Sequence, residues 1–472
     1  MPQTTADIQT YINENQQQFE QALIEWLKLP SVSTDSAFKQ DVRRAAEWLL
    51  KRFENIGFKT ELIETNGHPI VYAESPPVPG APVVLVYGHY DVQPPDPLEL
   101  WHTPPFEPRI QEGKIFARGA TDDKGQALTH VLSAEAWIKT QGSLPLQLKF
   151  LIEGEEECGS AALYEFLEGK YDKGGPAVQK RLKADVCVIS DGSQYDHGQP
   201  AVTYGLKGLA YFELRLTGPN RDLHSGAFGG SVANPANALT KILAAMIDDR
   251  GRVQVPGFYD PVIAISDEER AQFAALNFDN QEFMRELGID AIAGEEGYTT
   301  LERRWARPTF DINGLWSGYQ GEGAKTVLPG KAGAKFSFRL VPNQTPEYVY
   351  DRLRSFVESL CPPGIKMELI DLHGAPGVLV PIDNPFMDAA KAAIERGFEK
   401  TPVFVRTGGS IPVVLKFKEL LDMDTLLLGW GQDDDNMHSP NEKFLLADFH
   451  RGIKASAFLW EEIARVHGTR AR

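Results

Sequence analysis

Cysteine is scarce in this 472-residue sequence, which contains only Cys158, Cys187 and Cys361. Three widely separated cysteines are too few for a fold that is stabilised by several disulfides, and they do not form the closely spaced pairs of a cysteine-based zinc site. This composition suits a reducing compartment. We therefore expect a cytoplasmic protein.

Basic residues and long apolar runs are also in short supply. The 48 lysines and arginines are outnumbered by 65 aspartates and glutamates, which gives a net charge of −17. Such a charge opposes binding to nucleic-acid phosphates or anionic membrane surfaces. No apolar run is long enough to span a bilayer, and residues 1–21 lack the basic start and apolar core of a signal peptide. We expect neither nucleic acid nor a membrane as a partner.

Several catalytic motifs are missing as well. The sequence contains no Gly-x-Ser-x-Gly, which disfavours a serine hydrolase, and no His-Glu-x-x-His, which disfavours a single-zinc protease. Residues 118–125 look superficially like a phosphate-binding loop. However, Lys124 precedes the final glycine and no Lys-Ser or Lys-Thr pair follows, so we reject that interpretation.

The length of the chain and its changing pattern predict two domains. Buried apolar strands alternate with helices in the first 200 residues, which indicates an α/β fold with a mostly parallel central sheet. From about Leu206, half-exposed strands and long helices follow the order strand, helix, strand, strand, helix, strand, the outline of a ferredoxin-like α+β domain. The α/β pattern resumes after about His373. We therefore predict a first domain in two parts, 1–207 and 376–472, interrupted by a second domain at 208–375.

The apolar run Val83–Tyr87 is the strongest candidate for a buried strand, and it leads into a histidine and an aspartate. His89 and Asp91 are two residues apart, so on an extended chain they point the same way. The pair fits an ordinary hydrogen-bonded strand end. It also fits a metal-binding imidazole with the carboxylate that orients it.

Other acidic and imidazole side chains follow predicted strands or begin a helix. These candidates are Asp122 and Asp123, Glu156 and Glu157, Asp191, and His438. A helix cap is the alternative role for the aspartate pair, and a solvated surface is the alternative for the glutamates. Because ligands of open α/β sheets gather at the carboxyl ends of the strands, we expect one crevice to collect these side chains.

This set of donors indicates two metal ions. Two histidines and three carboxylates suit zinc, manganese or cobalt, and they are too many for one catalytic ion that keeps an open position. Three carboxylates and one hydroxide also balance the charge of two divalent ions. A water between such ions, about 3.5–4 Å apart, is acidic enough to attack a carbonyl near neutral pH. One further acid, free of the metals, is needed to accept and return its proton.

Five motifs occur in a recognisable order over nearly the whole chain: Gly88–Pro94, Arg118–Gly125, Glu153–Ser160, Ser190–Asp191 and the segment around His438. Together they resemble the co-catalytic metallopeptidases of the aminoacylase, carboxypeptidase G and carnosinase superfamily, and most of all its carnosinase-like, cytosolic non-specific dipeptidase branch. The resemblance implies that the interrupted domain is catalytic and that the inserted domain is a lid that also forms a homodimer.

The resemblance also implies roles for individual residues. One ion is held by His89, Asp122 and Asp191, and the other by Asp122, Glu157 and His438. Asp122 is then the bridging ligand, Glu156 the general base and acid, and Asp91 the partner that orients His89. The choice of Asp122 over Asp123 rests on the family pattern alone.

Four more residues match substrate positions of the family. His224 resembles the lid histidine that reaches the partner subunit's active site and stabilises the developing oxyanion. Arg339, Thr326 and Ser410 resemble groups that bind the substrate carboxylate, for which an arginine fork is chemically suited. Ordinary turn and surface roles are the alternatives for His224 and Arg339.

The residue at position 191 narrows the predicted substrate class. In this superfamily an aspartate there resembles the dipeptidases and aminopeptidases, whereas a glutamate resembles the carboxypeptidases and N-acyl deacetylases. We therefore predict a metal-dependent dipeptidase acting on small peptides. An amidohydrolase of N-acyl or N-carbamoyl amino acids is the alternative within the family, and a non-catalytic metal-binding protein is the alternative outside it.

Overall fold

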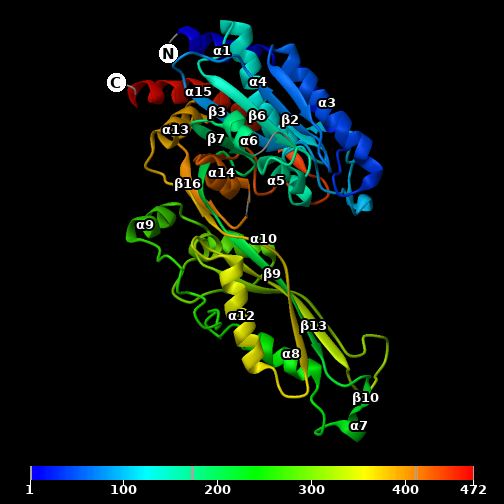
Figure 1. The fold of residues 1–472 in the computed structure, drawn as a ribbon. Coiled ribbons are helices and arrows are strands. Elements are labelled where there is room, and N and C mark those ends of the chain that lie inside the picture. Colours follow the sequence, from blue (N-terminus) through cyan, green and yellow to red (C-terminus); the bar gives the residue numbers. More distant parts are fainter. Residues whose placement is uncertain (1–2, 172–174, 410, 412, 471–472) are drawn as a thin grey trace. The chain divides into compact units, whose positions relative to one another are not determined.

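The computed structural model describes residues 3–171, 175–409, 411 and 413–470. The chain divides into two compact units. The flanking unit comprises Met1–Tyr204, Val380–Val405 and Val413–Arg472, and the inserted unit comprises Gly205–Leu379 and Arg406–Pro412. In Figure 1 the blue, cyan, orange and red segments build the flanking unit, while green and yellow segments build most of the inserted one. The described residues of 406–412 are grouped with the inserted unit, whereas the sequence predicts that they belong to the later part of the interrupted domain.

A large mixed sheet organises the flanking unit, which supplies all of its strands except β15 and the last residues of β8 and β16. Within the described residues, the order of its strands is β1-β2-β6-β3-β7-β17-β8-β15, with β16 also paired to β8. The bounds are β1 Lys59–Ile63, β2 Ile70–Glu74, β3 Val83–His89, β6 Gln147–Glu153, β7 Val186–Ser190, β8 Ala201–Leu206, β15 Val378–Leu379, β16 Val403–Thr407 and β17 Thr425–Leu428. The predicted α/β class is confirmed.

The parallel part of this sheet lies at its centre. Strands β6, β3, β7 and β17 run parallel to one another, whereas β1, β2, β8 and β15 pair antiparallel at the two sides. Strand β3 runs through Gly88 to His89, two residues beyond the apolar run that predicted it. The central strands are almost fully buried, as expected for parallel strands covered on both faces.

Helices cover this sheet, and one of them is buried around its whole circumference. The helices of the flanking unit are α1 Gln3–Glu14, α2 Gln16–Leu27, α3 Lys39–Asn55, α4 Lys124–Gln141, α5 Ala161–Leu167, α6 Gly175–Leu182, α13 Pro385–Phe398, α14 Val413–Leu421 and α15 Leu446–Arg470. Helix α4 packs against β3, α1, α2 and α15, and its residues 124–137 are all buried. The polar ones have partners; for example, His130 Nε2 lies 2.8 Å from Ser190 Oγ. Apolar residues from Ile8 to Leu27 have helical spacing that fits one helix, but the chain is broken at Asn15 into α1 and α2.

A small sheet holds two distant loops of the flanking unit together. It has the order β18-β5-β4, with β18 at Lys443–Leu445, β5 at Lys114–Phe116 and β4 at Arg109–Gln111. Strand β5 directly precedes the segment that contains Asp122, and β18 directly follows the segment that contains His438. Their antiparallel pairing therefore brings these two segments together although they are more than 300 residues apart.

The inserted unit has the predicted ferredoxin-like core. Its antiparallel sheet has the order β11-β13-β9-β14, and helices α8 and α12 pack against it. The bounds are β9 Gly208–Thr217, α8 Pro235–Ala244, β11 Thr309–Ser317, β13 Lys331–Leu340, α12 Pro346–Leu360 and β14 Lys366–Ala375. Alternate strand residues such as Phe212, Leu214, Phe336 and Phe338 form its buried core with the two helices. Chain order and strand order together give the predicted β-α-β-β-α-β topology.

The remaining elements of the inserted unit are short. They are β10 Leu223–His224, α7 Ser225–Phe228, α9 Asp267–Ala275, α10 Asn280–Leu287, α11 Thr300–Trp305 and β12 Val327–Leu328. Strands β10 and β12 form a two-stranded ribbon that pairs His224 with Val327. Two of the candidate substrate-binding residues, His224 and Thr326, belong to this ribbon or adjoin it.

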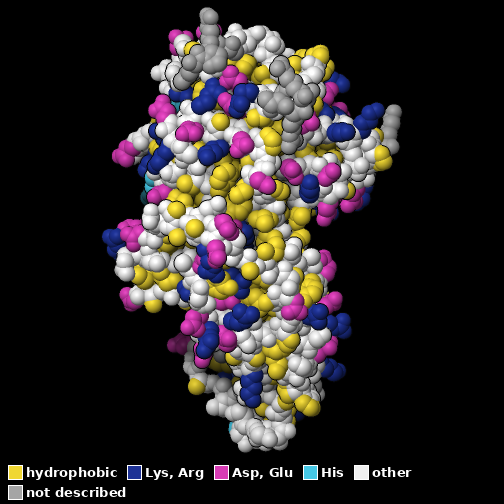
Figure 2. Space-filling model, turned by 90° about the vertical axis from the view of Figure 1, so that its left-hand side faces the viewer, with side chains coloured by type: hydrophobic (Ala, Val, Ile, Leu, Met, Phe, Trp, Pro, Cys, Tyr) yellow, Lys and Arg dark blue, Asp and Glu magenta, His cyan; other side chains and the backbone are white. Residues whose placement is uncertain are grey.

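The surface carries charges of both signs. Figure 2 shows acidic and basic side chains interspersed over the face in view, although acidic residues are in excess overall. Among the described helices, none combines the length and the apolar character that a membrane-crossing helix requires.

Candidate metal centre

The candidate ligands of the flanking unit come from the carboxyl ends of neighbouring parallel strands. His89 is the last residue of β3, and Asp191 directly follows β7. Glu156 and Glu157 lie in a 3-10 turn, Glu156–Cys158, shortly after β6. Because β6, β3 and β7 are adjacent and parallel, these residues emerge at the same edge of the sheet.

Asp122 and His438 reach the same edge from loops. Asp122 lies just before α4, whose first residue is Lys124. His438 lies between β17 and β18, with a backbone φ of 61° in the left-handed region. Both loops adjoin the β5–β18 pairing, which explains how residues so distant in sequence meet.

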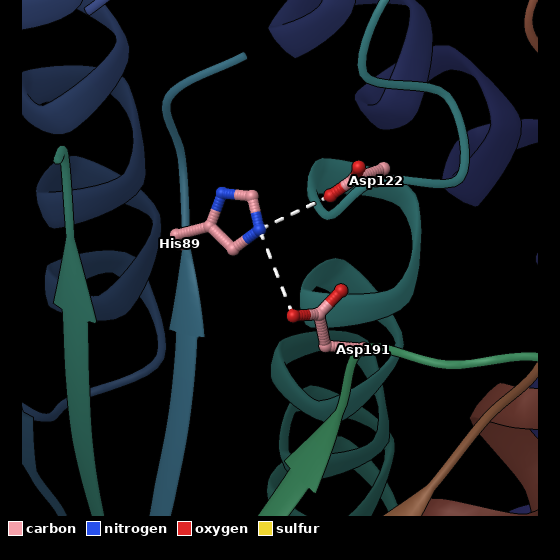
Figure 3. A group of neighbouring side chains, drawn as sticks. All are labelled: His89, Asp122 and Asp191. Atoms are coloured by element: carbon pink, nitrogen blue, oxygen red, sulfur yellow. Dashed lines mark ion pairs between the residues drawn. The ribbon is translucent and has the colours of Figure 1, made fainter. Parts of the chain in front are cut away.

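His89, Asp122 and Asp191 form the first group of ligands (Figure 3). The Nε2 atom of His89 lies 3.2 Å from Asp122 Oδ1 and 3.9 Å from Asp191 Oδ2. The imidazole is fully buried, and the two carboxylates are nearly so. Three donor atoms thus converge from β3, the start of α4 and the end of β7.

Asp122, Glu157 and His438 form the second group. His438 Nε2 lies 2.9 Å from Asp122 Oδ2 and 3.4 Å from Glu157 Oε2. The side chain of His438 is 57% exposed, whereas those of Asp122 and Glu157 are 10% and 4% exposed. Asp122 offers one carboxylate oxygen to each group, so it is placed to bridge two ions.

The residues fit divalent ions on chemical grounds. Imidazole nitrogen and carboxylate oxygen are the donors that zinc and similar ions take in catalytic sites. Among the described residues, the buried Nε2 of His89 has no hydrogen-bond partner in good geometry, although Asp122 Oδ1 lies 3.2 Å away. An ion bound between this nitrogen and the two aspartates would supply the missing partner.

The charges of the centre also call for cations. Burial raises the pKa of Glu157 to about 8 and that of Asp191 to about 6, and the charge on Asp122 adds to both shifts. The hydrogen bond to Asp122 raises the pKa of His438 to about 9. Without metal ions, these side chains therefore keep protons near neutral pH. Bound metal ions would neutralise the negative charges of the carboxylates instead.

Glu156 lies among these ligands without belonging to either group. Burial raises the pKa of its carboxyl to about 7; the charge on His89 opposes that rise, and those on Asp191 and Asp122 add to it. A carboxyl group that titrates near neutral pH can both accept and return a proton. The position and the pKa of Glu156 therefore suit the acid–base role that the sequence assigns to it.

Asp91 has more contacts than the sequence indicates. Its carboxylate lies 3.4 Å from Nδ1 of His89, but its backbone carbonyl is closer to that nitrogen, at 3.1 Å. The same carboxylate accepts hydrogen bonds from the backbone N–H groups of Glu156, at 3.2 Å, and Glu157, at 3.1 Å. Asp91 thus connects the strand that carries His89 to the turn that carries the two glutamates.

The structure separates the two adjacent aspartates that local sequence reasoning could not distinguish. The carboxylate of Asp122 faces both histidine rings. Oδ2 of Asp123 instead accepts the backbone N–H of His89 at 3.2 Å. Burial raises the pKa of Asp123 well above its ordinary value, which is consistent with a structural carboxyl group that supports β3.

Gln93 is a contact of the centre that the sequence analysis missed. Its Nε2 donates a hydrogen bond to Glu157 Oε2 at 2.8 Å and approaches Glu157 O at 3.4 Å. Gln93 belongs to the motif Gly88–Pro94, but nothing in the sequence shows that it contacts a glutamate 64 residues later. It fixes the orientation of one candidate ligand.

The candidate substrate residues lie in the inserted unit. Nδ1 of His224 accepts hydrogen bonds from Gly226 N, at 3.1 Å, and Ala227 N, at 3.3 Å. These bonds place the ring proton on Nε2, so the exposed imidazole presents an N–H donor. Thr326 is its neighbour across the ribbon, since Thr326 O accepts the N–H of Ser225 at 3.2 Å.

Arg339 lies toward the other end of the same unit. It is on β13, eight residues beyond Lys331, where that strand begins next to β12. At about 3.3 Å per residue, Lys331 and Arg339 are about 26 Å apart along the strand. Ser410, the fourth candidate, lies outside the described residues.

Comparisons with known proteins agree with this fold. Residues 85–462 match the sequence pattern of Peptidase family M20/M25/M40. The chain therefore belongs to this family and is a metallopeptidase. The predicted resemblance to the carnosinase-containing superfamily is confirmed.

The similar proteins span nearly the whole chain. The Cys-Gly metallodipeptidase dug1 of Schizosaccharomyces pombe is 33% identical over 96% of this chain and 97% of its own. The human Beta-Ala-His dipeptidase is 31% identical over 97% of this chain and 92% of its own. The crystal structure of human carnosine dipeptidase 1 covers 98% of this chain and 99% of its own, with a TM-score of 0.82 and 30% identity.

One similar structure is named for a different activity. The M20 family metallo-carboxypeptidase Sso-CP2 from Sulfolobus solfataricus also has a TM-score of 0.82, with 32% identity, and the match covers 95% of this chain and 99% of that one. Overall similarity alone therefore leaves the position of the cleaved bond to be tested.

Proposed function

We propose that this protein is a dipeptidase that uses two divalent metal ions, with zinc as the expected metal and manganese or cobalt as alternatives. The observation that carries the proposal is the pair of ligand groups that share Asp122, with Glu156 beside them. The relatives named as Cys-Gly and Beta-Ala-His dipeptidases, aligned over nearly the full chain, support dipeptides as substrates.

Different residues of the flanking unit would have separate roles in such a reaction. His89 and Asp191 would hold one ion, Glu157 and His438 the other, and Asp122 both. The bound ions would polarise the scissile carbonyl and acidify a water molecule. Glu156 would take a proton from that water and pass it to the leaving amine nitrogen. Asp91 would orient His89 and hold the turn in which Glu156 lies.

The candidate residues of the inserted unit would bind and polarise the substrate. The Nε2–H of His224 would donate to the developing oxyanion, and Arg339, Thr326 and Ser410 would bind the substrate carboxylate. His224 adjoins β12, whereas Arg339 lies about 26 Å along β13, much farther than a dipeptide reaches. This separation favours a homodimer in which His224 serves the partner subunit's active site.

A panel of substrates tests this function. The metal-free protein, reloaded separately with Zn²⁺, Mn²⁺ and Co²⁺, should hydrolyse free dipeptides such as Cys-Gly and β-Ala-His. We expect much slower hydrolysis of blocked dipeptides, N-acyl amino acids and N-carbamoyl amino acids. Preferential cleavage of the acylated amino acids would establish the amidohydrolase instead, and release of single residues from longer peptides would establish a carboxypeptidase.

Metal analysis completes the test. We expect about two equivalents of ion per chain, as the two ligand groups require. Two bound ions without turnover of any compound in the panel would contradict the proposed catalysis and favour a metal-binding protein. The mass of the native particle would show whether the protein is a dimer.

A further inference from the structure

Glu442 is a buried carboxylate that neither ligand group includes. It lies four residues after His438 and directly before β18, and its exposure is 0%. Burying a carboxylate is costly unless it is fully paired. Its partners therefore indicate why the fold retains a charge at this position.

Within the described residues, the Glu442 carboxylate is contacted by donors from the segment that leads to Asp122. Oε2 accepts Arg118 Nη1 at 2.8 Å and Gly119 N at 2.9 Å. Oε1 accepts Thr121 N at 3.0 Å and Asp122 N at 3.1 Å. One side chain on the His438 segment thus binds three backbone amides and one guanidinium of the Asp122 segment.

All four groups that face the Glu442 carboxylate are hydrogen-bond donors, so both of its oxygens act as acceptors. Arg118 is itself buried, and its Nη2 donates to Pro94 O at 3.2 Å. A glutamine would turn an NH₂ group toward N–H donors, which leaves buried donors without acceptors.

A second contact reinforces the same connection. Thr121 Oγ1 donates to Lys443 O at 2.6 Å and lies 2.9 Å from Asp435 Oδ2. Lys443 Nζ in turn donates to Asp435 Oδ1 at 2.7 Å. The segments before and after His438 are therefore both fixed to Thr121, the neighbour of Asp122.

We propose that Glu442 is a positioning residue of the metal centre, because it fixes the backbone of Asp122 relative to the segment that carries His438. The inference rests on the proposed two-ion centre and concerns mainly the ion between Asp122, Glu157 and His438. Two of its three ligands lie on the segments that Glu442 joins. His89 and Asp191 are instead fixed by the ends of their own strands.

The test compares E442Q with E135Q and the wild-type protein. Glu135 is the matched control because it is a buried carboxylate of the flanking unit whose hydrogen bond goes to Arg52 Nη2, at 2.7 Å, and not to a segment that carries a candidate ligand. Each metal-free protein is titrated with Co²⁺, followed by visible absorption, and with Zn²⁺ against a chromogenic chelator. Thermal unfolding of the metal-free forms reports folding separately.

E442Q should bind its weaker ion about 10–100-fold less tightly than the wild-type protein, the usual cost of losing a partner of a metal ligand. The Co²⁺ spectrum of the second equivalent should change, and excess metal should restore kcat with little change in KM. E135Q should bind both ions as the wild type does, even where its unfolding temperature falls. Loss of stability alone does not produce this pattern.

If E442Q does not fold, a second variant, E442D, provides the test. E442D keeps the charge beside Arg118 but is one methylene shorter, so it cannot reach all four donors, and its metal affinity should also fall. If folded E442Q had the metal affinity and the Co²⁺ spectrum of the wild-type protein, the inference would be overturned. If E442Q did not fold, the same result in E442D would overturn it. If the wild-type protein itself bound no ions, the proposed function would fail, which is a different result.

Discussion

The candidate residues of the two units are held in very different ways. In the flanking unit, Asp122 faces two histidines through its carboxylate and is fixed through its backbone by Glu442. In the inserted unit, His224 is exposed, and its ring has only two local hydrogen bonds, both within its own turn. Metal ligands need several fixed donors around one point, whereas a group that meets the substrate must remain accessible.

This contrast predicts that substitutions of the candidate metal ligands in the flanking unit change metal binding, whereas substitutions at His224 or Thr326, or at Glu156 beside the ligands, change catalysis alone.

Asp122→Ala should have the largest effect, because Asp122 belongs to both ligand groups. We expect loss of most bound metal and a fall in activity beyond the roughly 10²–10⁴-fold that loss of a proton-transfer group costs. Metal content by mass spectrometry and kcat/KM for a dipeptide measure this. Asp123→Ala is the neighbouring control; two ions retained in D122A would contradict the bridging role.

Glu156→Ala should separate chemistry from metal binding. Glu156 lies outside both ligand groups, so about two ions should remain while kcat falls about 10²–10⁴-fold. The pH dependence of the residual activity should lose its acidic limb, since that limb reports a group titrating near pH 7. Activity close to that of the wild type would exclude Glu156 as the base.

His224→Ala should leave metal content and unfolding temperature unchanged and lower kcat about 10²–10³-fold, the cost of losing one oxyanion donor. His373→Ala is a suitable control, because His373 is an exposed histidine of the same unit.

Mixing H224A with E156A after dissociation tests the proposed exchange between subunits. A mixed dimer has one site with an intact Glu156 and the partner subunit's intact histidine, so part of the activity should return. No recovery in a mixture shown to contain mixed dimers would place His224 in its own subunit's site, or outside the reaction.

The smallest expected effect is a pH dependence of stability in the metal-free protein. The folded state raises the pKa of Glu156 to about 7, of Glu157 to about 8 and of Asp191 to about 6. Acids with raised pKa values retain protons in the folded state, so their contribution to stability is lost as pH rises through those values. His438, with a pKa of about 9, acts in the same direction.

The metal-free protein should therefore unfold at progressively lower temperature between pH 5 and pH 9. Ions replace the retained protons, so the increase in unfolding temperature on adding Zn²⁺ should grow over the same range. Differential scanning calorimetry with and without metal measures both trends. A metal-induced shift that is equal at pH 5 and pH 8 would contradict this account, and E135Q should follow the wild type.

Much of the fold could be predicted from local patterns. The apolar run Val83–Tyr87 predicts β3 because a strand buried on both faces has to be apolar throughout. The ferredoxin-like order of the inserted unit follows from alternating strands and amphipathic helices. The break at Asn15 was not predicted, because the apolar spacing of α1 and α2 fits one helix as well as two. The antiparallel direction of the outer strands was not predicted, since apolar content does not report strand direction.

The candidate ligands could be predicted for a similar reason. His89, Glu157 and Asp191 lie at or shortly after the ends of parallel strands, and those ends meet at one edge of any such sheet. Their roles remain predictions until the metal content of the variants is measured. The carboxylate of Glu442 and the amide of Gln93 were missed because their partners are backbone or side-chain groups far away in sequence.

The sequence by itself determined the class of fold and the family, and it predicted which residues would bind metal, because strand ends and ligand types are local properties of the chain. Only the tertiary structure gave Asp122 and Asp123 different neighbours, added the contacts of Asp91 with the glutamate turn and joined the Asp122 segment to that of His438. Each of these depends on which backbone amides face a given carboxylate. Backbone amides are the same at almost every position, so their partners are fixed only when distant segments pack together.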